Sequence, residues 1–154
     1  MTHVQRIREL FLRPRPAYAI AEAAELLGIE RDEVRAWMES GELERIETED
    51  GAMLPWEELV SFGMDFWSQE AVEQSLGAQA AETLPELLRL AHLEVRIPQM
   101  QIIALERLAA VDGKTVSAVL ARELRDLVSV HSEWLSREVP GFAAALAWPD
   151  AAGL

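Results

Sequence analysis

The stretch YAIAEAAELLGIERDEVRAWMESGEL, residues 18–43, decides the fold of the first half of the chain. Residues 21–27 and 30–40 have the apolar spacing of helices. Each is followed by a glycine, Gly28 or Gly41, which is the residue favoured just past a helix end. Apolar side chains stand where two steeply crossed helices bury their contact: Ile20, Ala23, Leu27, Ile29, Val34 and Trp37. The stretch therefore predicts two short helices joined by a tight turn.

Neighbouring segments extend this unit on both sides. Val4–Leu12 predicts a short amphipathic helix that the following prolines end. Arg45–Leu54 predicts a β-hairpin with Asp50-Gly51 as its turn. Pro55 predicts the first turn of another helix, which runs to about Phe62.

Together, residues 18–62 resemble the winged helix-turn-helix of the MerR and excisionase families. In those families the second helix, here about Arg31–Glu39, enters the major groove of DNA and the hairpin, or wing, lies along the backbone. The resemblance therefore makes Arg31 and Arg35 candidate DNA contacts.

The charge of this segment departs from the family pattern. The wing is usually basic in those families, whereas residues 44–54 read ERIETEDGAML, and residues 17–91 carry four arginines against eighteen acids. Duplex DNA carries a phosphate charge about every ~1.7 Å, so an acidic wing repels it. Two interpretations stay open: a DNA reader, or a helix-turn-helix retained for packing or for contact with a protein.

A second motif follows, LEVRIPQMQIIALERLAAVDGKTVSAVLARELRDLV, residues 93–128. Apolar and polar residues alternate over 93–97, which predicts a strand. Residues 99–111 have helical spacing, Asp112-Gly113 predicts a turn, and Thr115 or Ser117 is placed to cap a helix that runs to about Val130.

Residues 93–128 resemble the ribbon-helix-helix domain of the Arc and MetJ repressors and of many antitoxins. The family forms an intertwined dimer in which two strands pair as an antiparallel ribbon that enters the major groove. The resemblance implies a dimer core of Leu93, Val95, Ile97, Leu105, Leu120 and Leu124. The alternate residues His92, Glu94 and Arg96 would then face DNA.

In the same family, backbone amides at the start of the second helix hold a DNA phosphate, which the helix dipole favours. Here those amides belong to Thr115–Ser117, and Lys114, the only lysine of the chain, lies beside them. The alternative is a strand and two helices that serve only for dimerisation.

Both ends of the chain carry further candidates. Arg13 and Arg15 alternate with prolines in an arm that either reaches DNA or pairs with carboxylates of the acidic domain. In the apolar tail, Trp134, Phe142 and Trp148 either anchor a protein partner or fold back on the dimer core or the linker helices.

The sequence predicts a mainly α-helical protein with five parts. They are a basic N-terminal helix and arm (1–16), an acidic winged helix-turn-helix (17–64), linker helices (65–91), a ribbon-helix-helix (92–130) and an apolar C-terminal tail (131–154). The linker was expected to contain a helix at 66–76 and, behind a capping box of Thr83 and Glu86, a second helix at 84–90.

The chain has 154 residues, a net charge of −13 and no cysteine. No catalytic constellation, metal-ligand spacing or cofactor motif is recognisable, and no signal peptide or membrane segment is evident, so a cytoplasmic non-enzyme is expected. The resulting expectation is a dimeric DNA-binding transcriptional regulator, an antitoxin-like autorepressor that reads DNA mainly through the ribbon-helix-helix. Its partners would be a second copy, double-stranded DNA and a toxin or other protein. The alternative is a dimeric protein-interaction adaptor that does not bind DNA.

Overall fold

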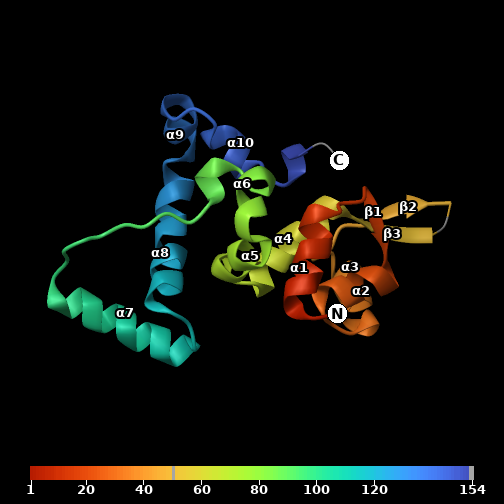
Figure 1. Cartoon of the computed structure of the whole chain (residues 1–154), viewed down its shortest axis with the longest axis horizontal. Coiled ribbons are helices and arrows are strands. Elements are labelled where there is room, and N and C mark those ends of the chain that lie inside the picture. Colours follow the sequence, from red (N-terminus) through yellow and green to blue (C-terminus); the bar gives the residue numbers. More distant parts are fainter. Residues whose placement is uncertain (50, 153–154) are drawn as a thin grey trace. The chain divides into compact units, whose positions relative to one another are not determined.

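The computed structural model describes residues 1–49 and 51–152. The protein is mainly helical, as the sequence predicts, with a small antiparallel sheet (Figure 1). The chain forms two compact units, an N-terminal unit of residues 1–90 and 147–152 and a second unit of residues 91–146. In the described part of the chain, no helix combines the length and the apolarity needed to cross a membrane.

The N-terminal unit places its strands between helices. Its elements are α1 (His3–Leu12), β1 (Ala17–Ala19), α2 (Ile20–Leu27), α3 (Arg31–Ser40), β2 (Ile46–Thr48), β3 (Gly51–Pro55), α4 (Trp56–Phe66), α5 (Gln69–Leu76) and α6 (Ala80–Thr83). The sheet has the order β1-β3-β2, with Tyr18 opposite Leu54 and Glu47 opposite Ala52. The predicted hairpin is confirmed, and Asp50 of its predicted turn lies outside the described residues.

Local sequence sets the ends of α2 and α3. A glutamate in the first turn of each helix accepts a hydrogen bond from the backbone amide before the helix: Glu22 from Ala19, at 3.1 Å, and Glu33 from Glu30, at 3.0 Å. Gly28 ends α2 with a φ of 76°, in the left-handed region that glycine enters at little cost. The two predicted helices of residues 18–43 are therefore confirmed.

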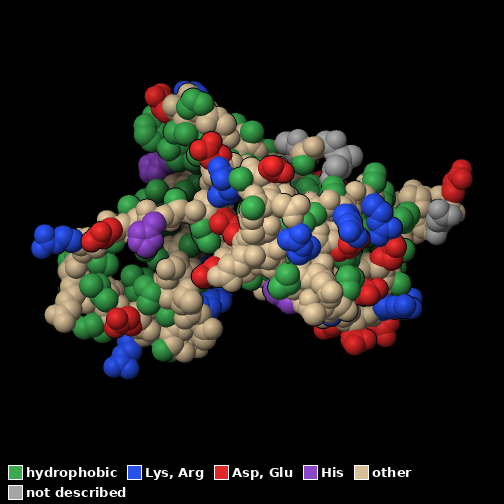
Figure 2. Space-filling view, in the orientation of Figure 1, with side chains coloured by type: hydrophobic (Ala, Val, Ile, Leu, Met, Phe, Trp, Pro, Cys, Tyr) green, Lys and Arg blue, Asp and Glu red, His purple; other side chains and the backbone are tan. Residues whose placement is uncertain are grey.

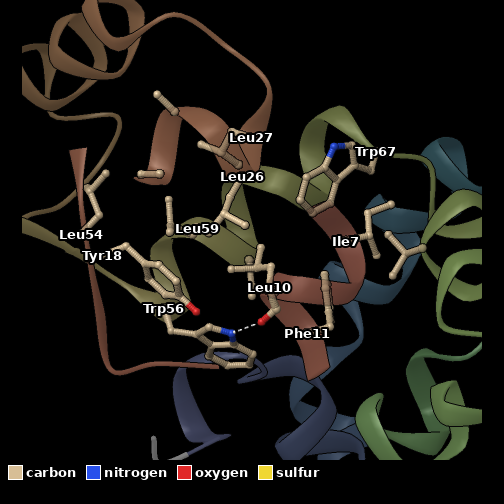
Figure 3. Close-up of a cluster of buried hydrophobic side chains, with 14 of the residues drawn as sticks. Ile7, Leu10, Phe11, Tyr18, Leu26, Leu27, Leu54, Trp56, Leu59 and Trp67 are labelled. Atoms are coloured by element: carbon tan, nitrogen blue, oxygen red, sulfur yellow. Dashed lines mark hydrogen bonds between the residues drawn. The ribbon is translucent and has the colours of Figure 1, made fainter. Parts of the chain in front are cut away.

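The core of this unit draws on every helix from α1 to α6 (Figure 3). Trp56 is central to it, because its ring is buried while its indole N–H donates to the Leu10 carbonyl at 2.8 Å. A buried tryptophan needs such an acceptor for its N–H. Side chains that are completely or almost completely buried include Ile7, Leu10, Tyr18, Val34, Leu43, Leu54, Leu59, Val60, Val72 and Leu76.

Residues 65–91 differ from the expected linker. Trp67, Val72 and Leu84 are buried in the core, so residues 65–90 are part of the N-terminal unit. The predicted capping box of Thr83 and Glu86 is wrong, because Thr83 is the last residue of α6 and does not precede a helix. The Thr83 hydroxyl donates to the Gln79 carbonyl at 2.8 Å. Pro85 keeps the residue before it extended, so that only a short 3₁₀ turn, Glu86–Leu88, follows.

The second unit consists of an extended segment and a helical hairpin followed by two short helices. These are residues 91–98, then α7 (Gln99–Asp112), α8 (Val116–Val130), α9 (Ser132–Glu138) and α10 (Phe142–Leu146). The predicted strand at 93–97 does not form in this single chain, because no described strand of the chain lies beside it to complete a hydrogen-bonded ladder. The predicted helices of the hairpin are confirmed.

The apolar tail divides between the units. Trp134 and Phe142 belong to the second unit, whereas Trp148 belongs to the N-terminal unit. The Trp148 ring stacks on Phe11, at 6.2 Å and 25° between the planes, and lies edge-on to Trp56 at 6.2 Å. Trp148 therefore folds back on α1 and α4, and not on the dimer core or the linker helices that the sequence favours.

Candidate dimer and nucleic-acid interface

The second unit buries very little of its apolar surface. The structure describes all of residues 91–146, and the buried hydrophobic side chains among them are Ala109, Val119 and Ala145. Large apolar side chains are exposed instead along the extended segment, α7, α8 and α9 (Figure 2). They include Leu93, Val95, Met100, Ile103, Leu108, Val111, Leu124, Leu127, Val130 and Trp134.

Helix α7 carries apolar side chains on more than one side, between the polar residues Gln99, Gln101, Glu106 and Arg107. Its Ala109 is buried, and α7 packs along α8. Met100 and Val111 project from the opposite side of the helix and are 76% and 84% exposed. The side of α7 opposite Ala109 therefore exposes large apolar side chains in the single chain.

The six residues expected in a dimer core are not enclosed within the single chain. Leu93, Val95 and Leu124 are exposed, and Ile97, Leu105 and Leu120 are half-buried. Leu93, Val95 and Ile97 share one face of the extended backbone, because alternate side chains point the same way. An extended segment that carries such a face can pair with a second copy of itself and bury this row.

The other face of the extended segment carries the expected DNA-contacting residues. His92, Glu94 and Arg96 are all exposed. Within residues 1–49 and 51–152, none of the three side chains takes part in a hydrogen bond or ion pair. The guanidinium N–H groups of Arg96 are therefore all free to donate. Arginine is the side chain that most often contacts guanine bidentately.

The turn between α7 and α8 leads into the first backbone amides of α8. Gly113 and Lys114 donate their amides to the Ala109 carbonyl, and the Thr115 hydroxyl accepts from the Ala118 amide at 3.1 Å. Thr115 is therefore the helix cap. Among the described residues, no acceptor is present for the amides of Val116 and Ser117, which form the positive end of α8.

Arg122 reinforces this turn, although the sequence pattern did not single it out. Its guanidinium donates to the Asp112 carboxylate at 2.7 Å and also contacts Glu123. The hydrogen bond to Asp112 raises the pKa of Arg122. This hydrogen bond links α8 to the last residue of α7 across the turn. The spacing of the two residues in the sequence does not predict it.

The cationic candidates of the N-terminal unit are mostly paired with carboxylates. Arg13 contacts Glu9 at 3.3 Å, and Arg35 contacts Asp32 at 3.1 Å. Arg31 is exposed. These residues and the Arg96–Lys114 group belong to different units, so neither unit alone brings all the expected DNA contacts together.

Arg15 is held most closely. It contacts Glu22 at 3.0 Å and lies over the Tyr18 ring, with its guanidinium carbon 4.5 Å from the ring centroid. The hydrogen bond with Glu22 raises the pKa of Arg15. The pKa of Glu22 is lowered, first by the Ala19 amide and then by Arg15. The arm therefore pairs with carboxylates, which is one of the two arrangements expected for it.

Comparisons with protein-family models, curated proteins and solved structures gave no match for this chain. Among the described residues, no group of three or more His, Asp or Glu side chains is placed to hold a metal ion.

Proposed function

We propose that this protein is a dimeric DNA-binding transcriptional regulator that reads DNA through its second unit. The observation that carries the proposal is the alternating extended segment, with its apolar row uncovered, followed directly by a hairpin of two helices. Such a unit of 56 residues with three buried hydrophobic side chains is far below what a stable separate core needs. A second copy supplies both the missing strand and the missing cover.

The same pairing explains how DNA would be recognised. When two copies of residues 92–97 pair, Leu93, Val95 and Ile97 turn inward, and His92, Glu94 and Arg96 form the outer face of the ribbon. Arg96 would contact guanine, and Glu94 would accept a hydrogen bond from a cytosine amino group. The amides of Val116 and Ser117, with the Lys114 side chain, would hold a backbone phosphate.

The charge distribution supports DNA recognition by the second unit. Residues 91–146 carry six basic and seven acidic residues, a net charge of −1, whereas residues 1–90 carry eight arginines against nineteen acids, a net charge of −11. Because affinity for DNA is largely electrostatic, the second unit is the part that DNA can approach.

For the N-terminal unit we propose a winged helix-turn-helix that acts as an acidic scaffold and not as a reader. Its order α1, β1, α2, α3 and then the β2–β3 hairpin supports the winged assignment. The pairing of Arg13, Arg15 and Arg35 with carboxylates supports the scaffold role. An autorepressor of the antitoxin type, cytoplasmic and with a toxin or other protein as a further partner, is the regulatory setting that we propose.

The experiment that tests this proposal measures binding of the full chain to the DNA upstream of its own gene. Arg96→Ala and Lys114→Ala should each weaken binding by at least about tenfold and leave the dimer intact. Arg107→Ala, which removes an equal charge from exposed surface of α7, is the matched control and should have little effect. If Arg31→Ala or Arg35→Ala abolishes binding and Arg96→Ala does not, then α3 and not the second unit recognises the DNA.

A second candidate function is favoured by the net charge of −11 on residues 1–90. In this alternative the protein is a dimeric adaptor that binds other proteins and not DNA. The adaptor would dimerise in the same way. The adaptor would not bind DNA. A regulator, by contrast, would bind DNA with an affinity that falls as salt rises, which is the signature of phosphate contacts.

A further inference from the structure

Three aromatic rings form a cluster at the surface of the N-terminal unit, outside its closed core. Trp37 of α3 lies 4.5 Å from Phe62 and 5.7 Å from Phe66 of α4, measured between ring centroids. Phe62 and Phe66 are 4.9 Å apart. Trp37 and Phe62 are half-buried, and Phe66 is 53% exposed. We call these three residues the aromatic patch.

Carboxylates lie beside the aromatic patch on both helices. Glu33 stands one turn before Trp37 on the same face of α3, and Glu58 stands one turn before Phe62 on α4. Asp65, three residues after Phe62, is exposed at the same end of α4. Trp37 and Phe62 therefore each have an acidic neighbour at helical spacing, and Asp65 directly precedes Phe66.

Positive charge is absent from the surrounding sequence. Residues 46–88, which include all of α4, α5 and α6, contain ten acids and no Arg, Lys or His. On α3, Arg35 is two residues from Trp37 and so projects from the other side of the helix, where it contacts Asp32. The field at the aromatic patch is therefore negative.

An exposed aromatic surface with a negative rim selects its occupant by charge. A second copy of this unit would bring a net charge of −11 against the same charge, and DNA would be repelled. A cationic protein segment is attracted to the carboxylates, and an arginine can stack on the face of an aromatic ring. We propose that the aromatic patch is a docking site for an arginine-bearing amphipathic segment of another protein. Its apolar side chains would contact Phe66 and Phe62, and its arginines would contact Asp65 and Glu33.

This docking site goes beyond the proposed DNA-binding function and does not depend on it. The test uses the full chain and a labelled synthetic amphipathic peptide of arginine and leucine, with binding followed by fluorescence anisotropy. We expect saturable binding that weakens as salt rises, because the carboxylates of Asp65 and Glu33 are exposed and are screened. A peptide in which glutamine replaces arginine should bind at least about tenfold more weakly.

Two pairs of variants separate docking at the aromatic patch from general attraction to an acidic protein. Asp65→Lys and Glu86→Lys change the net charge equally, and both residues are exposed. Phe66→Ser and Leu87→Ser each remove an exposed apolar side chain, of 53% and 49% exposure. Only Asp65→Lys and Phe66→Ser should weaken binding, by about tenfold.

Three outcomes would overturn the docking site. The first is an equal loss of binding in Glu86→Lys, which would mean that net charge alone attracts the peptide. The second is no detectable binding of the arginine peptide to the wild-type chain. The third is a reduction of the chain's own molar mass in Phe66→Ser, which would identify the occupant as a second copy. Circular dichroism of each variant shows that the fold is retained.

Discussion

The two units of this chain use their apolar residues in opposite ways. In the N-terminal unit, tryptophans and leucines from α1 to α6 close around one another, and even the indole N–H of Trp56 has its acceptor. In the second unit, α7 and α8 bury little more than Ala109 and Val119 and leave larger side chains in solvent. Fully burying a leucine or valine contributes about 1.5–3 kcal/mol. The N-terminal unit thus buries a core large enough for an independent domain. The second unit buries too few apolar side chains to be stable without a partner.

The contrast predicts where a single truncation has the largest effect on folding. Leu59→Ala in the N-terminal unit removes a side chain with 0% exposure, so it should lower the free energy of unfolding by about 2–5 kcal/mol. Leu87→Ala, at 49% exposure in the same unit, should change it by less than about 0.5 kcal/mol. Urea denaturation followed by tryptophan fluorescence measures both. Similar losses in the two variants would mean that the core is not closed around Leu59.

In the second unit, a polar change should act on association and leave the folding of the N-terminal unit unaffected. Val95→Glu places a charge in the apolar row of Leu93, Val95 and Ile97, which we propose to be buried between two copies. The dimer would then bury two such charges, one from each copy. The substitution should weaken self-association by at least about 100-fold. Arg96→Ala, on the outer face of the same segment, should leave the dimer intact. Analytical ultracentrifugation checks this pair, and a Val95→Glu chain that still dimerises at micromolar concentration would contradict the ribbon.

A smaller effect is expected at the start of α8. Thr115→Ala removes the hydroxyl that accepts from the Ala118 amide, and it should destabilise this helix by about 1 kcal/mol. Thr115→Ser keeps the acceptor and should lose only a fraction of that. Hydrogen exchange of the amides in the first turns of α8 measures the difference. Equal exchange in the two variants would show that the cap contributes nothing.

The smallest effect concerns Glu22, which is half-buried at the start of α2. Its lowered pKa means that the charged form stabilises the folded state at pH values above its unfolded pKa. This contribution is lost as the pH falls through the folded pKa. Glu22→Gln should therefore cost less than about 1 kcal/mol at neutral pH and nothing in acid. Thermal unfolding at both pH values checks this, and a cost that grows in acid would contradict the sign.

The N-terminal unit could be predicted largely because its signals are local. Gly28 and Gly41 end α2 and α3 where a positive φ is required, and both predicted ends are correct. The capping box at Thr83 failed because Pro85, two residues later, keeps Leu84 extended. The core role of Trp67, Val72 and Leu84 was missed because it depends on packing against distant parts of the chain and not on local periodicity.

The candidate site was harder to predict, because its decisive contacts are not local. The alternation at 93–97 indicates a strand, but a strand forms only beside a partner, and within the described chain none is present. Arg15 pairs with Glu22 across strand β1, and Arg122 pairs with Asp112 across the turn between α7 and α8, so neither pair has a fixed spacing in the sequence.

The central claim is that the second unit is completed by a second copy of the chain. Its most direct test is the molar mass of the full-length protein in solution, measured by sedimentation equilibrium at micromolar concentration. The account predicts a mass of twice the 17.2 kDa of one chain, independent of salt because apolar contacts hold the copies together. A mass of 17.2 kDa across the accessible concentration range would contradict it.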